Sequence, residues 1–341
     1  MLIDLYQNTN TKSSTQKEPF LLCTFCKETI TNYYGNLRNR IICITFAIVM
    51  RIVNLLGGLG NQMFQFALYR ALQKRFPDER VLVDLHCFNG YKKHRGFEID
   101  KVFDVTFEKA SWREVARLAY PYPNFQSWRI GSRVLPVRHT MLKERADFTL
   151  EPTALTRTVD TYYDGYWQHE EYFNDIRDVI LQTFRFPAFA DEQNQQTAER
   201  LQTTNSIGIH VRRGDYTHDK LFHDICDLDY YRQAISRMQQ GTDGELFCIF
   251  SDDMAWCREH IAPLLAGKAI VYADWNRGER SIQDIHLMSL CRHNIIANSS
   301  FSWWGAWLNQ NAEKVVVAPA KWIHISGAVS PVPNSWIRIN T

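Results

Sequence analysis

Short apolar runs and amphipathic stretches alternate along the chain from residue 50 onward. The first apolar run, residues 51–56, ends in the glycine turn 57–60, and the apolar residues that follow recur at helical spacing. This order predicts a strand followed by a long helix, with Asn61 as the N-cap of the helix. A second strand is expected at residues 81–85.

The alternation is more regular in the second half of the chain. Because strands that alternate with helices form a mostly parallel sheet covered on both faces, this pattern predicts an α/β fold. Residues 87–160 give no assignment, and residues 161–184 are expected to lead from a strand into a helix. The strands predicted in the second half are 207–211, 246–250, 269–272, 294–297 and 314–317, and the helices lie near 229–239, 253–265, 281–292 and 302–311.

A polar segment after Pro187 divides the α/β pattern into two parts. We therefore expect an N-terminal α/β domain over residues 50–190 and a C-terminal α/β domain over residues 200–341, with a cleft between them. In such sheets ligands bind beyond the carboxyl ends of the strands, so the functional residues are expected there.

Residues 1–49 are polar and aperiodic, and we predict an irregular N-terminal extension. We expect Met50 to be the true initiator, because the pattern changes abruptly there; a real but loosely ordered tail is the alternative. The apolar run 41–50 is shorter than the roughly 18 residues of a membrane span. It also follows too many polar residues to be a signal peptide.

The composition is that of an ordinary globular protein, with 45% apolar and 22% charged residues among 341. The net charge is only +2, which lacks the basic excess of a general nucleic-acid-binding surface, so no nucleic-acid partner is expected. Eight cysteines without a repeating spacing indicate reduced thiols in the cytoplasm. Cys23 and Cys26 form one C-x-x-C pair without a second, and no metal site is predicted.

Charged and hydroxyl residues follow three of the strands predicted in the second half. Arginine makes forked contacts with phosphate oxygens, and a serine-rich helix start offers backbone N–H groups to an anion, so together these strand ends predict a site for a nucleotide diphosphate. Each group also has a structural explanation, since either aspartate could cap a helix and Arg213 could pair with Asp215. The residues are Arg212, Arg213 and Asp215 after the first strand, Asp252 and Asp253 after the second, and Ser300 and Ser302 after the third.

The glycine turn at residues 57–60 lets a ligand approach the backbone closely. It is similar to a dinucleotide fingerprint, but the third glycine position holds Met63, and the acidic residue about twenty positions on, Asp84, is poorly placed. The sequence also lacks a P-loop, because no glycine is followed by Lys-Ser or Lys-Thr. A dehydrogenase is therefore disfavoured.

Five segments form a specific set: GGLGNQMFQFA (57–67), DGYWQHEEYF (164–173), IHVRRGDY (209–216), FSDD (250–253) and NSSFSWWGAWLN (298–309). In this order they resemble the family 11 glycosyltransferases, the α-1,2-fucosyltransferases, of bacterial type. The resemblance covers residues 50–341, which is nearly the entire chain apart from the extension. The H-x-R-R-x-D element also resembles that of the wider superfamily containing α-1,6- and protein O-fucosyltransferases.

The resemblance implies a GT-B-like fold, in which two Rossmann-like α/β domains with parallel sheets face a cleft. It implies inverting transfer of L-fucose from GDP-β-L-fucose to the 2-hydroxyl of a terminal β-galactoside, forming an α-1,2 linkage in surface-glycan or oligosaccharide synthesis. No metal or other cofactor is required in this family. That property fits the arginine pair, because preorganised cations can stabilise the charge that develops on the departing GDP.

Roles for individual residues follow from the resemblance. Asn61, after Gly60, would line the cleft where donor and acceptor meet. Asp284 and His286 match another superfamily element, either structural or base-binding. In the C-terminal domain Arg212 and Arg213 would bind the diphosphate, His210 and Asp215 would shape that loop, Ser300 and Ser302 would face the phosphates, and Asp252 or Asp253 would hold guanine or ribose.

The general base is expected near the arginines. An inverting displacement usually has a carboxylate or histidine accept the acceptor proton, and Asp215, His218 and Asp219 are the candidates. We place Asp215 first, although it could instead pair with an arginine, and the step could be dissociative enough to need little base assistance. The catalytic residues expected are therefore Arg212, Arg213 and Asp215.

The expected acceptor is a galactose-terminated oligosaccharide or a lipid-linked glycan. Because such acceptors are often lipid-linked, we expect a cytoplasmic enzyme with peripheral contact at the inner face of the membrane. A non-catalytic sugar-binding protein is one alternative, but a lectin does not need a diphosphate clamp. A fucosyltransferase of other regiochemistry is the second alternative.

Overall fold

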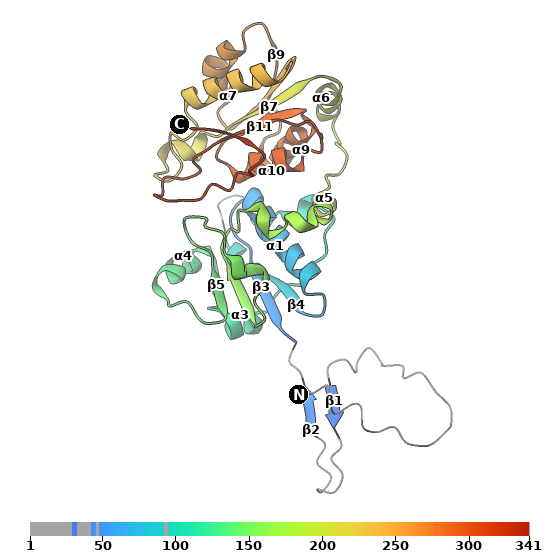
Figure 1. The fold of residues 1–341 in the computed structure, drawn as a ribbon, viewed down its shortest axis with the longest axis vertical. Helices are drawn as coiled ribbons and strands as arrows, with labels where there is room; N and C mark the ends of the chain where they lie inside the picture. The colour runs from blue at the N-terminus through green and yellow to red at the C-terminus, as the bar shows by residue number, and fades with distance from the viewer. Residues whose placement is uncertain (1–28, 33–41, 46–47, 92–94, 341) are drawn as a thin grey trace, which may run out of the picture. The chain divides into compact units, whose positions relative to one another are not determined.

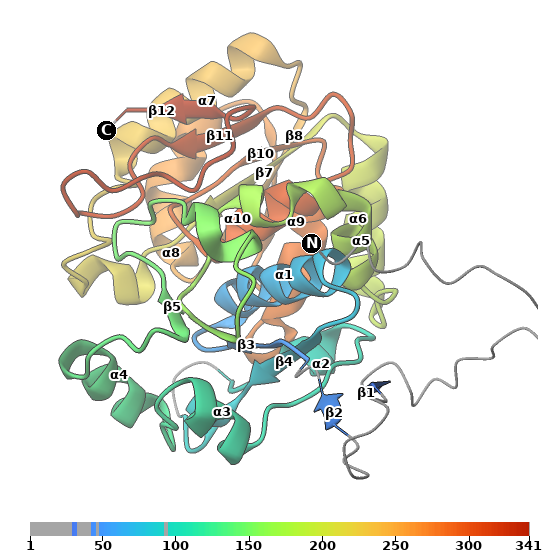
Figure 2. The same cartoon turned by 60° about the horizontal axis from the view of Figure 1, so that its bottom comes forward.

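The computed structural model describes residues 29–32, 42–45, 48–91 and 95–340. It divides into two compact units, Met1–Ile48 and Val49–Thr341. In the first unit, strands β1 (Thr29–Asn32) and β2 (Ile42–Thr45) pair antiparallel, where the sequence pattern predicted no regular element. Cys23 and Cys26 lie outside the described residues. The second unit contains two separate sheets, one from each half of its sequence (Figure 1 and Figure 2).

The first sheet has four parallel strands in the order β4-β3-β6-β5. Its inner strand β3 is buried along its whole length, as expected for a parallel strand covered on both faces. The predicted strands at 51–56 and 81–85 correspond to β3 and β4. The strands are β3 (Met50–Asn54), β4 (Arg80–Asp84), β5 (Met141–Lys143) and β6 (Thr161–Asp164).

The helix after the glycine turn, α1 (Leu59–Arg75), has Gly58 and not Asn61 at its N-cap, so that detail of the prediction is wrong. The reason lies in the backbone of the turn. Gly57 has a φ of +83°, a left-handed conformation that glycine adopts readily, and this turn starts the helix early. Asn61 is therefore placed inside the first helical turn, where its side chain faces other elements.

The segment that the pattern left unassigned contains α2 (Ile99–Val102), α3 (Trp112–Leu118) and α4 (Phe125–Val134). α3 and α4 each begin with a capping box, formed by side chains that bond the first helical turn. α3 has only seven residues and α4 only ten, so the helical period extends over too few turns to be assigned from the sequence. Two more helices, α5 (Arg177–Thr183) and α6 (Glu192–Thr203), follow β6, and α6 occupies most of the polar segment predicted to join the domains.

The second sheet has six parallel strands in the order β12-β11-β10-β7-β8-β9, so the predicted α/β fold with two parallel sheets is confirmed. The helix predicted near 253–265 is interrupted, since a short α8 (Met254–Trp256) continues into π and 3-10 turns that contain Pro263. The strands are β7 (Ser206–Val211), β8 (Leu246–Ser251), β9 (Ala269–Ala273), β10 (His293–Ile295), β11 (Val316–Pro319) and β12 (Ile337–Ile339), and the other helices are α7 (Leu228–Gly241), α9 (Ile282–Leu290) and α10 (Ser300–Leu308).

Helices α1 and α10 pack together between the two sheets, and this contact joins the halves of the second unit (Figure 1). The indole N–H of Trp304 donates to the carbonyl oxygen of Gly60 at 2.9 Å. The ring of Phe64 lies 4.5 Å from that of Trp303 and 4.9 Å from that of Trp304, between centroids. One hydrophobic core therefore continues from the first sheet to the second.

Candidate functional site

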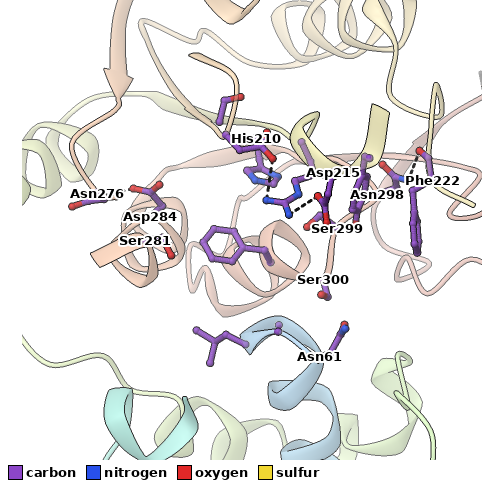
Figure 3. Close-up of a pocket in the computed structure, with 18 of the residues that line it drawn as sticks. Asn61, His210, Asp215, Phe222, Asn276, Ser281, Asp284, Asn298, Ser299 and Ser300 are labelled. Carbon is purple, nitrogen blue, oxygen red and sulfur yellow. Dashed lines mark hydrogen bonds and ion pairs between the residues drawn. The ribbon is translucent and has the colours of Figure 1, made fainter. Parts of the chain in front are cut away.

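A cavity of about 590 Å³ lies beyond the carboxyl ends of strands from both sheets. Its lining comes from the turn after β3, the loop after β6, the loops after β7, β8 and β9, and the start of α10. Figure 3 shows Asp284 and Asn276 at one end and Phe222 and Asn298 at the other, with His210 between them. The cavity therefore lies where the strand-end rule predicts a ligand site.

The N-termini of α1 and α10 both contribute to the cavity wall. No side chain caps either helix: the N-cap of α1 is Gly58, which has no side chain, and the Ser299 side chain at the N-cap of α10 accepts no hydrogen bond from the helix backbone. Neither helix has an acidic residue in its first turn. The positive end of each helix dipole is therefore not neutralised by its own first turn. Two such helix starts in one cavity favour an anionic ligand.

Gly60 is the point of closest approach between these two helices. A Cβ at this position would lie 2.7 Å from the backbone carbonyl carbon of Ser300 and 2.8 Å from the backbone nitrogen of Phe301. Because those atoms are backbone, no side-chain rotation can relieve the contact. The absence of a side chain at Gly60 thus lets the two helix starts approach each other, and Gly60, Asn61 and Ser300 all line the cavity.

Of the two adjacent arginines, Arg212 lines the cavity. Its guanidinium lies 2.7 Å from a carboxylate oxygen of Asp215 and 3.0 Å from one of Asp252, and it faces the ring of Tyr216. Asp252 also accepts a hydrogen bond from the backbone N–H of Arg213 at 2.9 Å. Asp215 and Asp252 line the cavity too, and together they fix the plane of the Arg212 guanidinium.

Three residues predicted for the site are not in the cavity lining. Arg213 extends over the ring of Trp256, 4.3 Å from its centroid, and its Nε donates to Asp253 at 3.2 Å. Asp253 caps α8 by accepting from the backbone N–H of Trp256, which is the structural explanation that the sequence left open. Ser302 is buried in α10, and its hydroxyl donates to backbone carbonyls within that region.

His210 lines the cavity beside Arg212 and is buried. Burial, together with the charge of Arg212, lowers the pKa of His210 to about 3, so the imidazole is neutral at physiological pH. Its Nδ1 atom is buried without a hydrogen-bond partner in the structure. The carbonyl oxygen of His210 accepts from the hydroxyl of Tyr231 at 3.0 Å, which holds the end of β7 in place.

At one end of the cavity, Asp284 and Asn276 form a carboxylate–amide pair in which Asn276 donates at 2.9 Å. Burial raises the pKa of Asp284 to about 7, so the carboxyl group titrates near neutrality. His286, two residues on, does not line the cavity, and its ring stacks between Phe186 and Phe189. The Asp-x-His element therefore contributes its aspartate to the site and its histidine to packing.

The opposite end of the cavity combines aromatic side chains with the amide of Gln168, which bridges the two halves of the unit. Gln168 donates from Nε2 to Asn61 at 2.8 Å and accepts from the indole N–H of Trp322 at 3.3 Å, so it links the two halves across the cavity. Asn298 donates to the carbonyl oxygens of Phe222 and Trp322, which gathers these segments. Aromatic faces next to amides suit a sugar ring.

Glu144 supports the loop that carries Gln168. Its carboxylate accepts from the backbone N–H of Tyr166 at 2.6 Å and also interacts with the backbone of Trp167 and Gln168. Trp167 has a φ of +56°, so the loop is held in a left-handed conformation that a non-glycine residue rarely adopts. Burial raises the pKa of Glu144 to about 7.

Sequence reasoning did not single out several residues of this cavity. Tyr166 and Gln168 lie within the DGYWQHEEYF segment, so the resemblance contained a signal for them. Trp322 and Arg95 lie outside all five segments. Arg95 donates to the hydroxyl of Ser281 at 3.0 Å, which makes a second bridge between the halves at the Asp284 end.

The described part of the chain offers neither a cluster of metal ligands nor a membrane-spanning helix. No group of three or more His, Cys, Asp or Glu side chains there is arranged to hold a metal ion. No helix there combines the length and apolarity that crossing a membrane requires.

Comparison with known proteins identifies the family. The model of "Glycosyl transferase family 11" matches residues 141–328. An α-1,2-colitosyltransferase of Escherichia coli is 30% identical, with 84% of this chain and 98% of that protein covered. The O-antigen biosynthesis glycosyltransferase WbnK of Escherichia coli is 29% identical over 83% of this chain and 98% of that protein.

A more distant relative is the galactoside α-(1,2)-fucosyltransferase 2 of Hylobates lar, 26% identical over 76% of this chain and 69% of that protein. Among solved structures, the NodZ α-1,6-fucosyltransferase soaked with GDP-fucose aligns with a TM-score of 0.47 and 15% identity, over 77% of this chain and 93% of that one. The family match and the bacterial relatives extend over most of the α/β unit. The chain therefore belongs to glycosyltransferase family 11.

Proposed function

We propose that this family 11 enzyme transfers L-fucose from GDP-β-L-fucose to the 2-hydroxyl of a terminal β-galactoside, with inversion to an α-1,2 linkage. The observation that carries the proposal is the convergence of two helix N-termini and the Arg212 guanidinium on one cavity. This combination suits the diphosphate of a nucleotide sugar. The galactoside α-(1,2)-fucosyltransferase among the relatives supports the choice of donor and acceptor.

The Asp284 end of the cavity suits guanine. Guanine presents N–H donors at N1 and at its exocyclic amine side by side, and a carboxylate can accept both. Asp284 is held by Asn276, which leaves carboxylate lone pairs for such a contact. We therefore assign the base to this end, whereas Asp252 positions the Arg212 loop and Asp253 caps a helix.

In the proposed reaction the 2-hydroxyl oxygen of the acceptor attacks the anomeric carbon of fucose while the bond from that carbon to the β-phosphate oxygen breaks. The electron pair of that bond leaves with GDP, where Arg212 and the start of α10 stabilise the developing charge; one preorganised donor of this kind contributes about 3–4 kcal/mol. The acceptor proton passes to Asp215, the proposed general base on the cavity wall.

The end formed by Gln168, Phe222 and Trp322 is the proposed acceptor side. The rings offer apolar faces to a pyranose, and the amides offer donors and acceptors to its hydroxyl groups. Because Gln168 also contacts Asn61 at the start of α1, an acceptor bound here would lie next to the diphosphate region.

A second candidate donor is GDP-colitose, which the α-1,2-colitosyltransferase relative favours. Colitose is L-fucose without its 3-hydroxyl group. A site that hydrogen-bonds the 3-hydroxyl rejects the analogue lacking it, because a buried polar partner is then left unpaired. Rates with the two donors therefore distinguish these possibilities.

The test is release of GDP from GDP-fucose with lactose as acceptor, in EDTA, for the wild type, Arg212→Ala and Arg213→Ala. We expect wild-type formation of 2′-fucosyllactose in EDTA and a loss of about 10²–10³-fold in kcat/KM for Arg212→Ala. Arg213→Ala, which keeps the cavity lining intact, should lose much less. A folded Arg212→Ala variant with wild-type kcat/KM would refute the diphosphate clamp.

The remaining outcomes concern the donor, acceptor and metal. Turnover that needs a divalent cation would contradict the proposed metal-free reaction. Turnover with GDP-colitose and not GDP-fucose would overturn the proposed donor. Inactivity with lactose but activity with other β-galactosides would only move the acceptor within the proposed class.

A further inference from the structure

Helix α4 carries an exposed apolar face on the first α/β half. Ile130 is 62% exposed and Val134 is 71% exposed, and these residues lie one helical turn apart on the same side. Leu135 and Val137 continue the exposed apolar surface just after the helix. We call these four residues, with the neighbouring Arg129 and Arg133, the α4 face. Figure 1 and Figure 2 show α4 at the outer side of the first sheet, away from the second sheet.

Contacts on the other side of α4 prevent this face from turning inward. The indole N–H of Trp128 donates to Asp164 at 2.8 Å. Gly131 packs on the ring of Tyr122 so closely that a Cβ there would lie 2.2 Å from it. The carbonyl oxygen of Ser132 accepts from Lys143. The helix is thus fixed in an orientation that leaves Ile130 and Val134 in solvent.

Basic residues outnumber acidic residues in the segment that contains this face. Residues 115–143 contain Arg117, Arg129, Arg133, Arg138 and Lys143 but no aspartate or glutamate, although Glu114 and Glu144 flank the segment and Arg117 is paired with Asp160 at 2.7 Å. Arg129 and Arg133 are exposed, and no ion pair joins either of them to another described residue. Their charge is therefore available to an anionic partner.

We propose that the α4 face docks on an anionic lipid bilayer. A short helix that presents aliphatic side chains beside arginines suits the headgroup region, where the aliphatic groups enter the acyl boundary and the guanidinium groups remain at the phosphates. Arginines near an anionic leaflet gain further from its negative surface potential, and the attraction decays within about 8 Å at physiological salt. With one helix and two free arginines, binding is weak and reversible.

Docking through the α4 face would bring the acceptor side of the cavity toward the lipid surface. This part of the proposal rests on the proposed function. Trp128 of α4 bonds Asp164, which directly precedes the loop that carries Tyr166 and Gln168. One side chain on the inner side of α4 therefore connects this helix to the loop of the acceptor side. An acceptor glycan attached to a lipid could then reach the cavity from the membrane on which the enzyme sits.

The experiment is co-flotation of the full chain with vesicles of phosphatidylcholine containing phosphatidylglycerol, compared with phosphatidylcholine alone. We expect binding to the anionic vesicles that is lost at high salt. Ile130→Ser with Val134→Ser, and separately Arg129→Gln with Arg133→Gln, should weaken partitioning about tenfold or more. Arg232→Gln with Arg237→Gln on α7 removes the same charge from an exposed helix of the other half and should bind like the wild type.

Donor and acceptor are absent from this assay, so its result does not depend on the proposed function, and circular dichroism with thermal unfolding checks that each variant is folded. The proposal is overturned if the wild type does not bind anionic vesicles, if it binds neutral vesicles equally, or if the α7 pair loses as much binding as the arginine pair. It is also overturned if light scattering shows a dimer that the Ile130→Ser, Val134→Ser variant disrupts, because the face would then be a contact between two copies.

Discussion

The two walls of the cavity come from the two halves of the α/β unit and differ in chemistry. The wall from the second half supplies charged groups, with Arg212 held by Asp215 and Asp252, and with Asp284 at one end. The wall from the first half supplies helix N–H groups and amides, and its own charges, Arg95 and Glu98, lie 3.5 Å apart as an ion pair. Under the proposed function, the second half therefore makes most of the charged contacts to the donor, and the amides of the first half contact the acceptor.

The contact between the two walls should be the most sensitive feature. We expect Gly60→Val to lower the free energy of unfolding by about 3 kcal/mol or more and to abolish transfer, because a side chain there collides with the backbone of Ser300. Denaturant unfolding and GDP release measure the two effects. Gly241→Val on α7 is the control, since a Cβ there meets only the flexible end of Arg237. Wild-type stability in Gly60→Val would show that the halves do not need this close approach.

The charged wall should determine donor affinity and its pH dependence. Asp284→Asn should lower kcat/KM for GDP-fucose by about 10–100-fold, the range for hydrogen bonds to a charged group. Because the pKa of Asp284 is raised to about 7, protonation removes the acceptor as pH falls, so wild-type kcat/KM should fall below about pH 7. In Asp284→Asn this fall should be absent. An unchanged pH profile in the variant would place the titrating group elsewhere.

The uncharged wall should determine acceptor affinity instead. Gln168→Ala leaves the Asn61 amide and the Trp322 indole without their shared partner, and we expect the KM for lactose to rise about tenfold. The KM for GDP-fucose should change little. If donor KM rises as much as acceptor KM, the division between the two walls is wrong at this end.

The smallest expected effect compares two serines on one helix. Ser300→Ala should lower kcat/KM about fivefold, as expected for one neutral hydrogen bond, because Ser300 lines the cavity. Ser302→Ala should leave kcat/KM unchanged and reduce stability by about 1 kcal/mol, since its hydroxyl bonds only backbone carbonyls. Steady-state kinetics and thermal unfolding of both variants test these roles. A loss of kcat/KM in Ser302→Ala with none in Ser300→Ala would contradict them.

Regular elements could be predicted where the hydrophobic pattern was long and simple. β7, β8 and β9 lie close to their predicted positions, because buried parallel strands appear as continuous apolar runs. α3 and α4 were missed because they span only seven and ten residues, which gives a helical period few turns over which to repeat. The α4 face could not be seen in the sequence for the same reason.

The sequence by itself determined the α/β class and the presence of cations, hydroxyls and carboxylates at the strand ends where the cavity lies, since these depend on residue type and local period. Only the tertiary structure decided which of two residues adjacent in sequence lines the cavity. Successive residues at a strand end point to opposite sides, so Arg212 faces the cavity while Arg213 lies over Trp256. Likewise, Gln168 meets Trp322, 154 positions away in the chain, because two separate loops fold against each other, and no local pattern encodes that contact.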